Sequence, residues 1–229
     1  MNTIMLLISV SLAWSANSVF DVPQAARATG YSTFLAEIGD EAEYRRDWGI
    51  EAGDSIRLAE PYTVFFMTHE EVLSFADSEP GSDVFSFGRP RCYAFPVVAG
   101  DEWIETHRIF RNLHENGTKI IEDRPTYFYQ SSSFGGKEDP VLKLRKEYPT
   151  EQGYSILNLR MLTWASYYLI RSPGGEIQGI DRRQIPDWGI SDHMLSTDES
   201  MRAMRESALK YKNTCESMTE EDTYKQRSN

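Results

Sequence analysis

Apolar residues follow two different spacings along this chain, and both spacings predict regular structure. Short apolar runs between turn residues, such as 62–67 and 91–98, are typical of β-strands. Near the C-terminus, Met201, Met204 and Ala208 recur at three- and four-residue intervals, which predicts one apolar stripe on a helix. We therefore expect an α+β fold with a mostly antiparallel meander sheet, a helix after the first strand, and an amphipathic C-terminal helix packed on the sheet.

Between these segments the predicted elements follow one another closely. The motif Thr68-His69-Glu70-Glu71 is a capping box, because Thr68 and Glu71 can each satisfy a backbone N–H at a helix start. A short helix is also expected over 141–148. The predicted strands are 62–67, 83–88, 91–98, 102–115, 117–123, 126–132 and 154–162, with a hairpin over 165–181.

The same pattern suggests how the chain is divided. The lead-in is expected to be irregular and partly helical, with a helix cap at Ser32 or Thr33. The two strand-rich blocks are expected to form one compact unit. The divisions are a signal peptide at 1–18, the lead-in at 19–55, a first block at 56–135, a second block with the C-terminal helix at 136–218, and a polar tail at 219–229.

The N-terminal run 4–14 contains no charge and is too short to span a bilayer. Small residues follow it, with Ser15 and Ser18 at positions that suit signal cleavage, although no Lys or Arg precedes the run. A buried first element of the fold is the alternative. We favour a secretory signal, which predicts a secreted or periplasmic protein.

Export would expose the two cysteines to an oxidising compartment. Cys92 lies in a predicted strand and Cys215 in the C-terminal helix, so a bridge would tie that helix to the sheet. Spacing alone does not establish that the two thiols meet. Cys92 and Cys215 are therefore a candidate disulfide.

Composition narrows the classes of partner. The formal net charge is −11, and no basic cluster that could neutralise a nucleic-acid backbone is visible. We expect neither nucleic acid nor an anionic membrane surface as partner, and no membrane span. Most of the negative charge falls within 35–83, which we interpret as a solvated face.

Residues 102–123 carry the strongest turn signal. Asn116-Gly117 between extended runs predicts a two-residue hairpin, because type I′ turns need positive φ at both central positions. Asn116 also begins an Asn-Gly-Thr glycosylation sequon, which matters only in a eukaryotic secretory pathway. The hairpin would pair Glu115 with Thr118, Leu113 with Ile120 and Arg111 with Glu122.

Two histidines lie in this hairpin, but strand alternation separates them. Glu105 and His107 share one face of the predicted strand, whereas His114 points to the other. A same-face Glu–His pair can bind zinc or act as an acid–base couple, although a third metal ligand would have to come from elsewhere. The competing interpretation is a pair of ordinary polar residues at an exposed sheet edge.

Other candidate chemistry is sparse. Asp187, Asp192 and His193 gather on a turn-like segment and could bind a cation, although the same residue types are common in turns. A Cys92–His107 nucleophile pair matches no thiol-enzyme signature. The chain also lacks the common nucleotide, zinc-protease and serine-hydrolase motifs.

These observations favour a non-catalytic protein. We expect a monomeric exported binding or adaptor module for a protein or a small ligand, without a cofactor, using the sheet or the groove beside the C-terminal helix. The alternative is a metal-assisted or acid–base hydrolase that uses Glu105 with His107, or Asp187 and Asp192 with His193.

Overall fold

The computed structural model describes residues 18–114, 119–133, 139–161, 165–181 and 194–217. The predicted signal run, Asn116, the Asp187–Asp192–His193 group and the polar tail lie outside these ranges. The helices and strands are α1 (Gln24–Glu37), α2 (Glu41–Trp48), β1 (Ile56–Leu58), β2 (Tyr62–Met67), α3 (His69–Asp77), β3 (Arg89–Ala99), β4 (Glu102–Arg111), β5 (Tyr127–Ser133), α4 (Pro140–Glu147), β6 (Ser155–Met161), β7 (Ala165–Arg171), β8 (Ile177–Asp181) and α5 (Thr197–Ser217).

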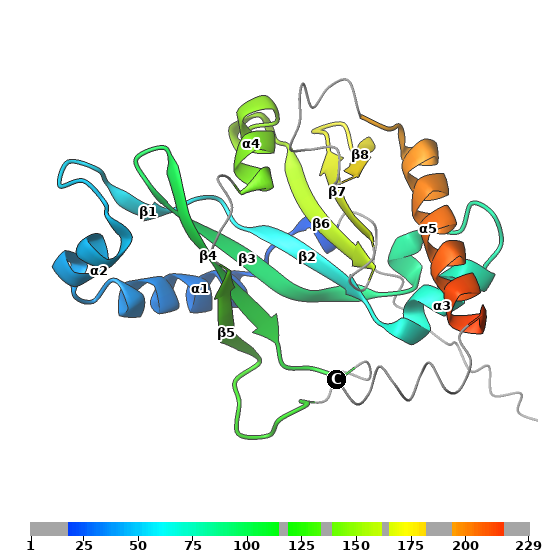
Figure 1. Cartoon of the computed structure of the whole chain (residues 1–229), viewed down its shortest axis with the longest axis horizontal. Coiled ribbons are helices and arrows are strands. Elements are labelled where there is room, and N and C mark those ends of the chain that lie inside the picture. Colours follow the sequence, from blue (N-terminus) through cyan, green and yellow to red (C-terminus); the bar gives the residue numbers. More distant parts are fainter. Residues whose placement is uncertain (1–17, 115–118, 134–138, 162–164, 182–193, 218–229) are drawn as a thin grey trace, which may run out of the picture.

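One sheet runs through the described part of the chain (Figure 1). Its order is β5-β4-β3-β2-β6-β7-β8, and β1 adds to β3 outside this path. All paired strands are antiparallel except β2 and β6, which lie parallel from Thr63 beside Leu157 to Met67 beside Met161. The two strand-rich blocks of the sequence therefore meet at this one parallel pair.

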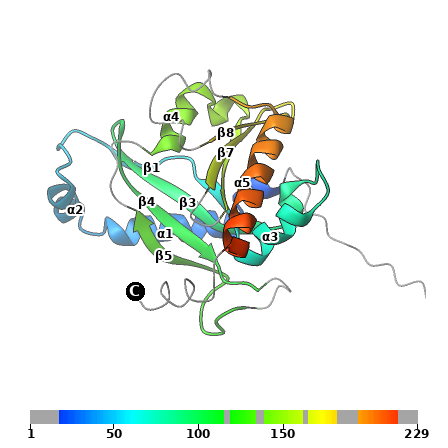
Figure 2. The same cartoon turned by 45° about the vertical axis from the view of Figure 1, so that its right-hand side comes forward.

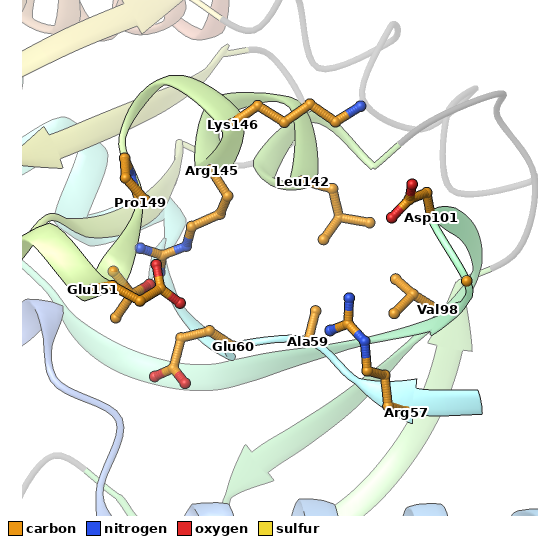
Figure 3. A pocket seen from close by; sticks show the side chains of 12 residues that line it. Arg57, Ala59, Glu60, Val98, Asp101, Leu142, Arg145, Lys146, Pro149 and Glu151 are labelled. Atoms are coloured by element: carbon orange, nitrogen blue, oxygen red, sulfur yellow. The ribbon is translucent and has the colours of Figure 1, made fainter. Parts of the chain in front are cut away.

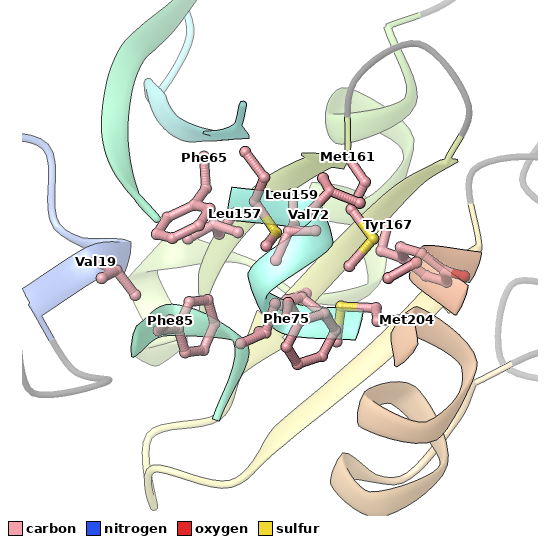
Figure 4. Packing of buried hydrophobic residues seen from close by; sticks show 14 of the residues in the cluster. Val19, Phe65, Val72, Phe75, Phe85, Leu157, Leu159, Met161, Tyr167 and Met204 are labelled. Carbon is pink, nitrogen blue, oxygen red and sulfur yellow. The ribbon is translucent and has the colours of Figure 1, made fainter. Parts of the chain in front are cut away.

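The largest hydrophobic cluster lies between the sheet and two helices. Phe65 and Leu159 point from β2 and β6 toward Val72 and Phe75 of α3 and Met204 of α5 (Figure 4). Alternation along the strands puts every second side chain on this face. The apolar stripe of α5 is thus buried against the sheet, as its spacing predicted.

Helix α1 covers the other end of the same face. Its Ala26 packs against Tyr93, Phe95 and Ile109, and Tyr93 lies beside Thr63 in the β2–β3 register. A Cβ added at Gly30 would meet the Phe95 ring at 2.5 Å. Glycine at this position therefore lets α1 lie close to β3.

The opposite face of the sheet carries α4. Val141 and Leu144 are fully buried, and they belong to a cluster that includes Tyr62, Val64 and Ile156. In Figure 2, α4 lies apart from α3 and α5.

Among the helices of the described ranges, none combines the length and apolar character needed to cross a membrane.

Several sequence predictions are confirmed. The fold is α+β, with a mostly antiparallel sheet and α5 packed on it. Thr68 and Glu71 form the predicted capping box of α3. The helix follows β2, while β1 is a short additional strand before it.

Other predictions are wrong in detail. Ser32 and Thr33 do not cap a helix, because α1 already begins after Pro23. Residues 83–88 contain a short 3₁₀ helix over Val84–Ser86, where the Asp83 side chain accepts from the Phe85 N–H. That carboxylate supplies a local hydrogen bond that competes with strand formation.

The tight hairpin after β4 is also wrong. Arg111 lies beside Tyr127 in the register, not beside Glu122. Buried Asn112 ends β4, since its side chain donates to the carbonyl oxygens of Ile121 and Arg124 and accepts from the Ile121 N–H. These bonds hold Ile121 and Arg124 in a loop outside the sheet, so β4 pairs with β5 across a longer connection.

The candidate disulfide is absent, because Cys92 and Cys215 are both free thiols. Cys92 is fully buried on the face that α4 covers. Cys215 lies near the end of α5, which packs on the opposite face. The sheet therefore separates the two side chains.

The core predicts how stability responds to truncation. Replacing fully buried Phe65 by Ala should lower the free energy of unfolding by about 3–5 kcal/mol, because it removes apolar contacts and leaves a cavity. The matched control Leu209→Ala, at a position that is 37% exposed, should change it by less than about 0.5 kcal/mol. Urea denaturation measures both, and equal effects would contradict this packing.

Candidate functional site

A groove of about 280 Å³ lies between α4, β1 and the turn that joins β3 to β4 (Figure 3). Its lining combines charged and apolar side chains from segments far apart in the sequence. They include Arg57, Glu60, Val98, Asp101, Leu142 and Arg145. A concave site with an apolar floor and a few converging polar groups is the usual form of a small-ligand site.

The position of α4 sets one wall of this groove. Asp139 caps the helix by accepting from the Val141 N–H at 2.8 Å, and Pro140 occupies the first turn. The same carboxylate accepts from the Thr106 hydroxyl of β4 at 2.9 Å. Asp139 therefore starts the helix and ties it to the sheet.

Arg145 is a charged side chain of the groove that is largely buried. Burial lowers the pKa of its guanidinium, against the opposing charges of Glu60 and Glu151. One terminal nitrogen donates to the carbonyl oxygen of Tyr154 at 3.1 Å. Its Nε is buried and has no hydrogen-bond partner among the described residues. Buried donors are rarely left unpaired, so the hydrogen bonding of this guanidinium is incomplete among the described residues.

The other charged side chains around the groove differ in whether they already have a partner of opposite charge. Glu60 is occupied by Arg27, whose guanidinium lies 2.7 Å from its carboxylate. The guanidinium of Arg57 points into the groove opposite Leu142, and Val98 and Ala59 form apolar surface beside it (Figure 3). The arrangement can hold an anionic group next to a short apolar segment.

The predicted Glu105–His107 pair lies elsewhere, on the face that α1 covers. Nε2 of His107 is 3.1 Å from Oε1 of Glu105, so the shared face is confirmed. Both side chains are buried, with exposed fractions of 0% for His107 and 3% for Glu105. They are therefore not ordinary polar residues at an exposed edge.

Tyr44 of α2 joins this pair. Its hydroxyl donates to Oε1 of Glu105 at 2.6 Å. Burial raises the pKa of Tyr44, and the bond to the Glu105 carboxylate raises it further. The Tyr129 ring packs edge-on against His107 from β5, with ring centroids 5.6 Å apart. We call Tyr44, Glu105 and His107 the buried triad.

The remaining candidates do not join either site. His114 is exposed beyond the end of β4. Burial raises the pKa of the Cys92 thiol to about 12, which opposes a thiolate nucleophile at neutral pH. Within the described ranges, no cluster of three or more His, Cys, Asp or Glu side chains could hold a metal ion.

Sequence reasoning missed Arg145 and Tyr44. Each lies on a short helix whose residue pattern predicts only an ordinary exposed charge or aromatic ring. Tyr44 contacts Glu105, which lies more than fifty residues away on a strand. Arg145 lines the groove together with residues that precede and follow its helix in the sequence.

No known family model, characterised protein or solved structure shows a significant match to this chain.

Tyr62, which is buried under α4 near Asp139, predicts that the stability of the fold responds to alkaline pH. Burial, and then the nearby Asp139 carboxylate, raise the pKa of Tyr62 well above its ordinary value. The folded chain keeps a proton that the unfolded chain releases near pH 10, so this contribution to stability is complete below that pH and is lost as pH rises toward the folded pKa.

Denaturation between pH 8 and pH 11 tests this effect. The free energy of unfolding should fall more steeply above about pH 10 for the wild-type chain than for Tyr62→Phe. The control Tyr31→Phe, which changes an exposed ring, should retain the wild-type slope. Identical slopes in all three proteins would show that Tyr62 titrates normally.

Proposed function

We propose that this chain is a non-catalytic binding protein that holds a small carboxylate-bearing molecule in the groove between α4 and β1. The observation that carries the proposal is Arg145, whose largely buried side chain retains an unpaired Nε–H beside the groove. A carboxylate is the natural acceptor for such a donor, because charge-assisted hydrogen bonds are the stronger ones.

Size and lining restrict the ligand. A volume of about 280 Å³ is at the lower end of the range for small-molecule sites. The anionic group would lie between Arg145 and Arg57, and the apolar part would pack on Val98 and Leu142. Asp101 and Glu151 at the rim could accept an ammonium group, so amino acids belong among the carboxylates to be tried.

A hydrolase is less well supported. The His107 side chain has no exposed surface, so a substrate would need a rearrangement of α2 or β5 to reach it. The protonated state favoured for Cys92 also leaves that thiol a poor nucleophile.

Export and a monomeric state remain part of the proposal. Val19 and Phe20 are buried in the main core cluster, with exposed fractions of 1% and 3%. A cleaved signal must therefore end before them. Both Ser15 and Ser18 meet this condition.

Binding can be tested on the full chain with a panel of acetate, butyrate, amino acids and inorganic phosphate. Calorimetry should detect one saturable site for at least one carboxylate. Arg57→Gln removes a charge for which the described residues provide no ion pair, and should weaken binding by about ten- to a hundredfold. Arg145→Lys should weaken it similarly.

The matched control is Arg202→Gln, at an exposed position on α5, which should bind like the wild type. Affinity that is unchanged in Arg57→Gln and Arg145→Lys would exclude this groove. Binding of phosphate alone would keep the anion site and reject the carboxylate.

N-terminal sequencing of the protein isolated from the cells that produce it tests whether the signal peptide is cleaved and the protein exported. We expect a mature chain that begins at Ala16 or Val19, because a later start would remove buried Val19 or Phe20 from the core. An intact Met1 in the soluble intracellular fraction would contradict export.

A further inference from the structure

The buried triad has an arrangement that hydrogen bonding alone does not explain. Neither ring nitrogen of His107 forms a hydrogen bond among the described residues, although Nε2 lies 3.1 Å from Oε1 of Glu105. The oxygen is close but does not lie where an N–H of the ring would point. A fully buried imidazole with both nitrogens in this state requires an explanation.

The separation of Glu105 and His107 matches that between neighbouring ligands of one metal ion, and the Tyr44 hydroxyl lies beside the same carboxylate oxygen. Two ligands that each lie about 2.1 Å from an ion, at a right angle, are about 3 Å apart. In the triad, Oε1 of Glu105 is 3.1 Å from Nε2 of His107 and 2.6 Å from the Tyr44 hydroxyl oxygen. A shared ion also accounts for the poor alignment, since it would lie on the nitrogen lone pair while the oxygen lies to one side.

We propose that Tyr44, Glu105 and His107 bind a transition-metal ion, and that ferric iron is the ion this ligand set suits. The sequence supplied two donors on β4 and no third, and α2 supplies the third as a phenol. Carboxylate oxygen and imidazole nitrogen are ordinary iron ligands, and tyrosine oxygen also binds ferric iron in proteins.

Iron binding at this site releases one proton and leaves one positive charge that the two anionic ligands do not offset. The ion replaces the proton of the Tyr44 hydroxyl, which leaves to solvent, and an iron–oxygen bond forms in place of the hydrogen bond to Glu105. Phenolate and carboxylate then offset two of the three positive charges of ferric iron. No electron transfer is involved, and the ligand groove on the other face of the sheet takes no part.

Spectroscopy of the full-length protein tests this site directly. Protein freed of metal by a chelator is titrated with ferric nitrilotriacetate. We expect one iron per chain and a visible phenolate-to-iron charge-transfer band. Tyr44→Phe should abolish the band and weaken iron binding by about a hundredfold or more, while Tyr31→Phe, which changes an exposed tyrosine of α1, should retain both.

Wild-type protein alone provides a second test, in case a variant does not fold. Resonance Raman excitation within the band should enhance tyrosinate ring modes, and their absence would overturn the proposal. It would also be overturned by a full band in folded Tyr44→Phe, or by no saturable iron binding. Arg57→Gln should bind iron normally, so failure of the carboxylate groove and failure of this site are distinguishable.

Discussion

The parallel pairing of β2 with β6 is the constraint on which this fold depends. It is the single parallel contact of the described sheet, and it joins β1 to β5 on one side to β6 to β8 on the other. Parallel neighbours cannot be linked by a tight turn, and here the chain between them passes through α3, three further strands and α4 before it returns. The same pair contributes Phe65 and Leu159 to the main core, where α3 and α5 are packed.

Because side chains alternate along a strand, polar residues of β4 lie on both faces of the sheet. Thr106 points toward the α4 face and bonds Asp139, which fixes the wall of the ligand groove. Glu105 and His107 point to the other face, where Glu105 accepts from Tyr44. Adjacent residues of one strand therefore serve two separate buried networks. A slip of one residue in the register would exchange them and break both.

Local patterns predicted the parts of this structure that local physics determines. The capping box at Thr68 and Glu71 needs only neighbouring residues, and the stripe of α5 needs only helical spacing. The shared face of Glu105 and His107 follows from alternation in the same way. The fold class could be predicted because these elements leave apolar faces that must be buried together.

Long-range contacts account for what the sequence did not predict. Nothing local to β2 identifies β6 as its parallel neighbour, or Tyr44 as the partner of Glu105. The Asn-Gly pair favoured a tight hairpin, yet the buried bonds of Asn112 end β4 earlier. The candidate disulfide failed because it depended on which face of the sheet each cysteine occupies.

Native-state hydrogen exchange provides the most direct test of the central role of β2 and β6. If their pairing unites the sheet, backbone amides of β3 and of β7 should exchange through the same global opening, with equal free energies and equal denaturant dependence. Two distinct free energies, one for each side of the β2–β6 pair, would contradict this account and show that the halves unfold independently.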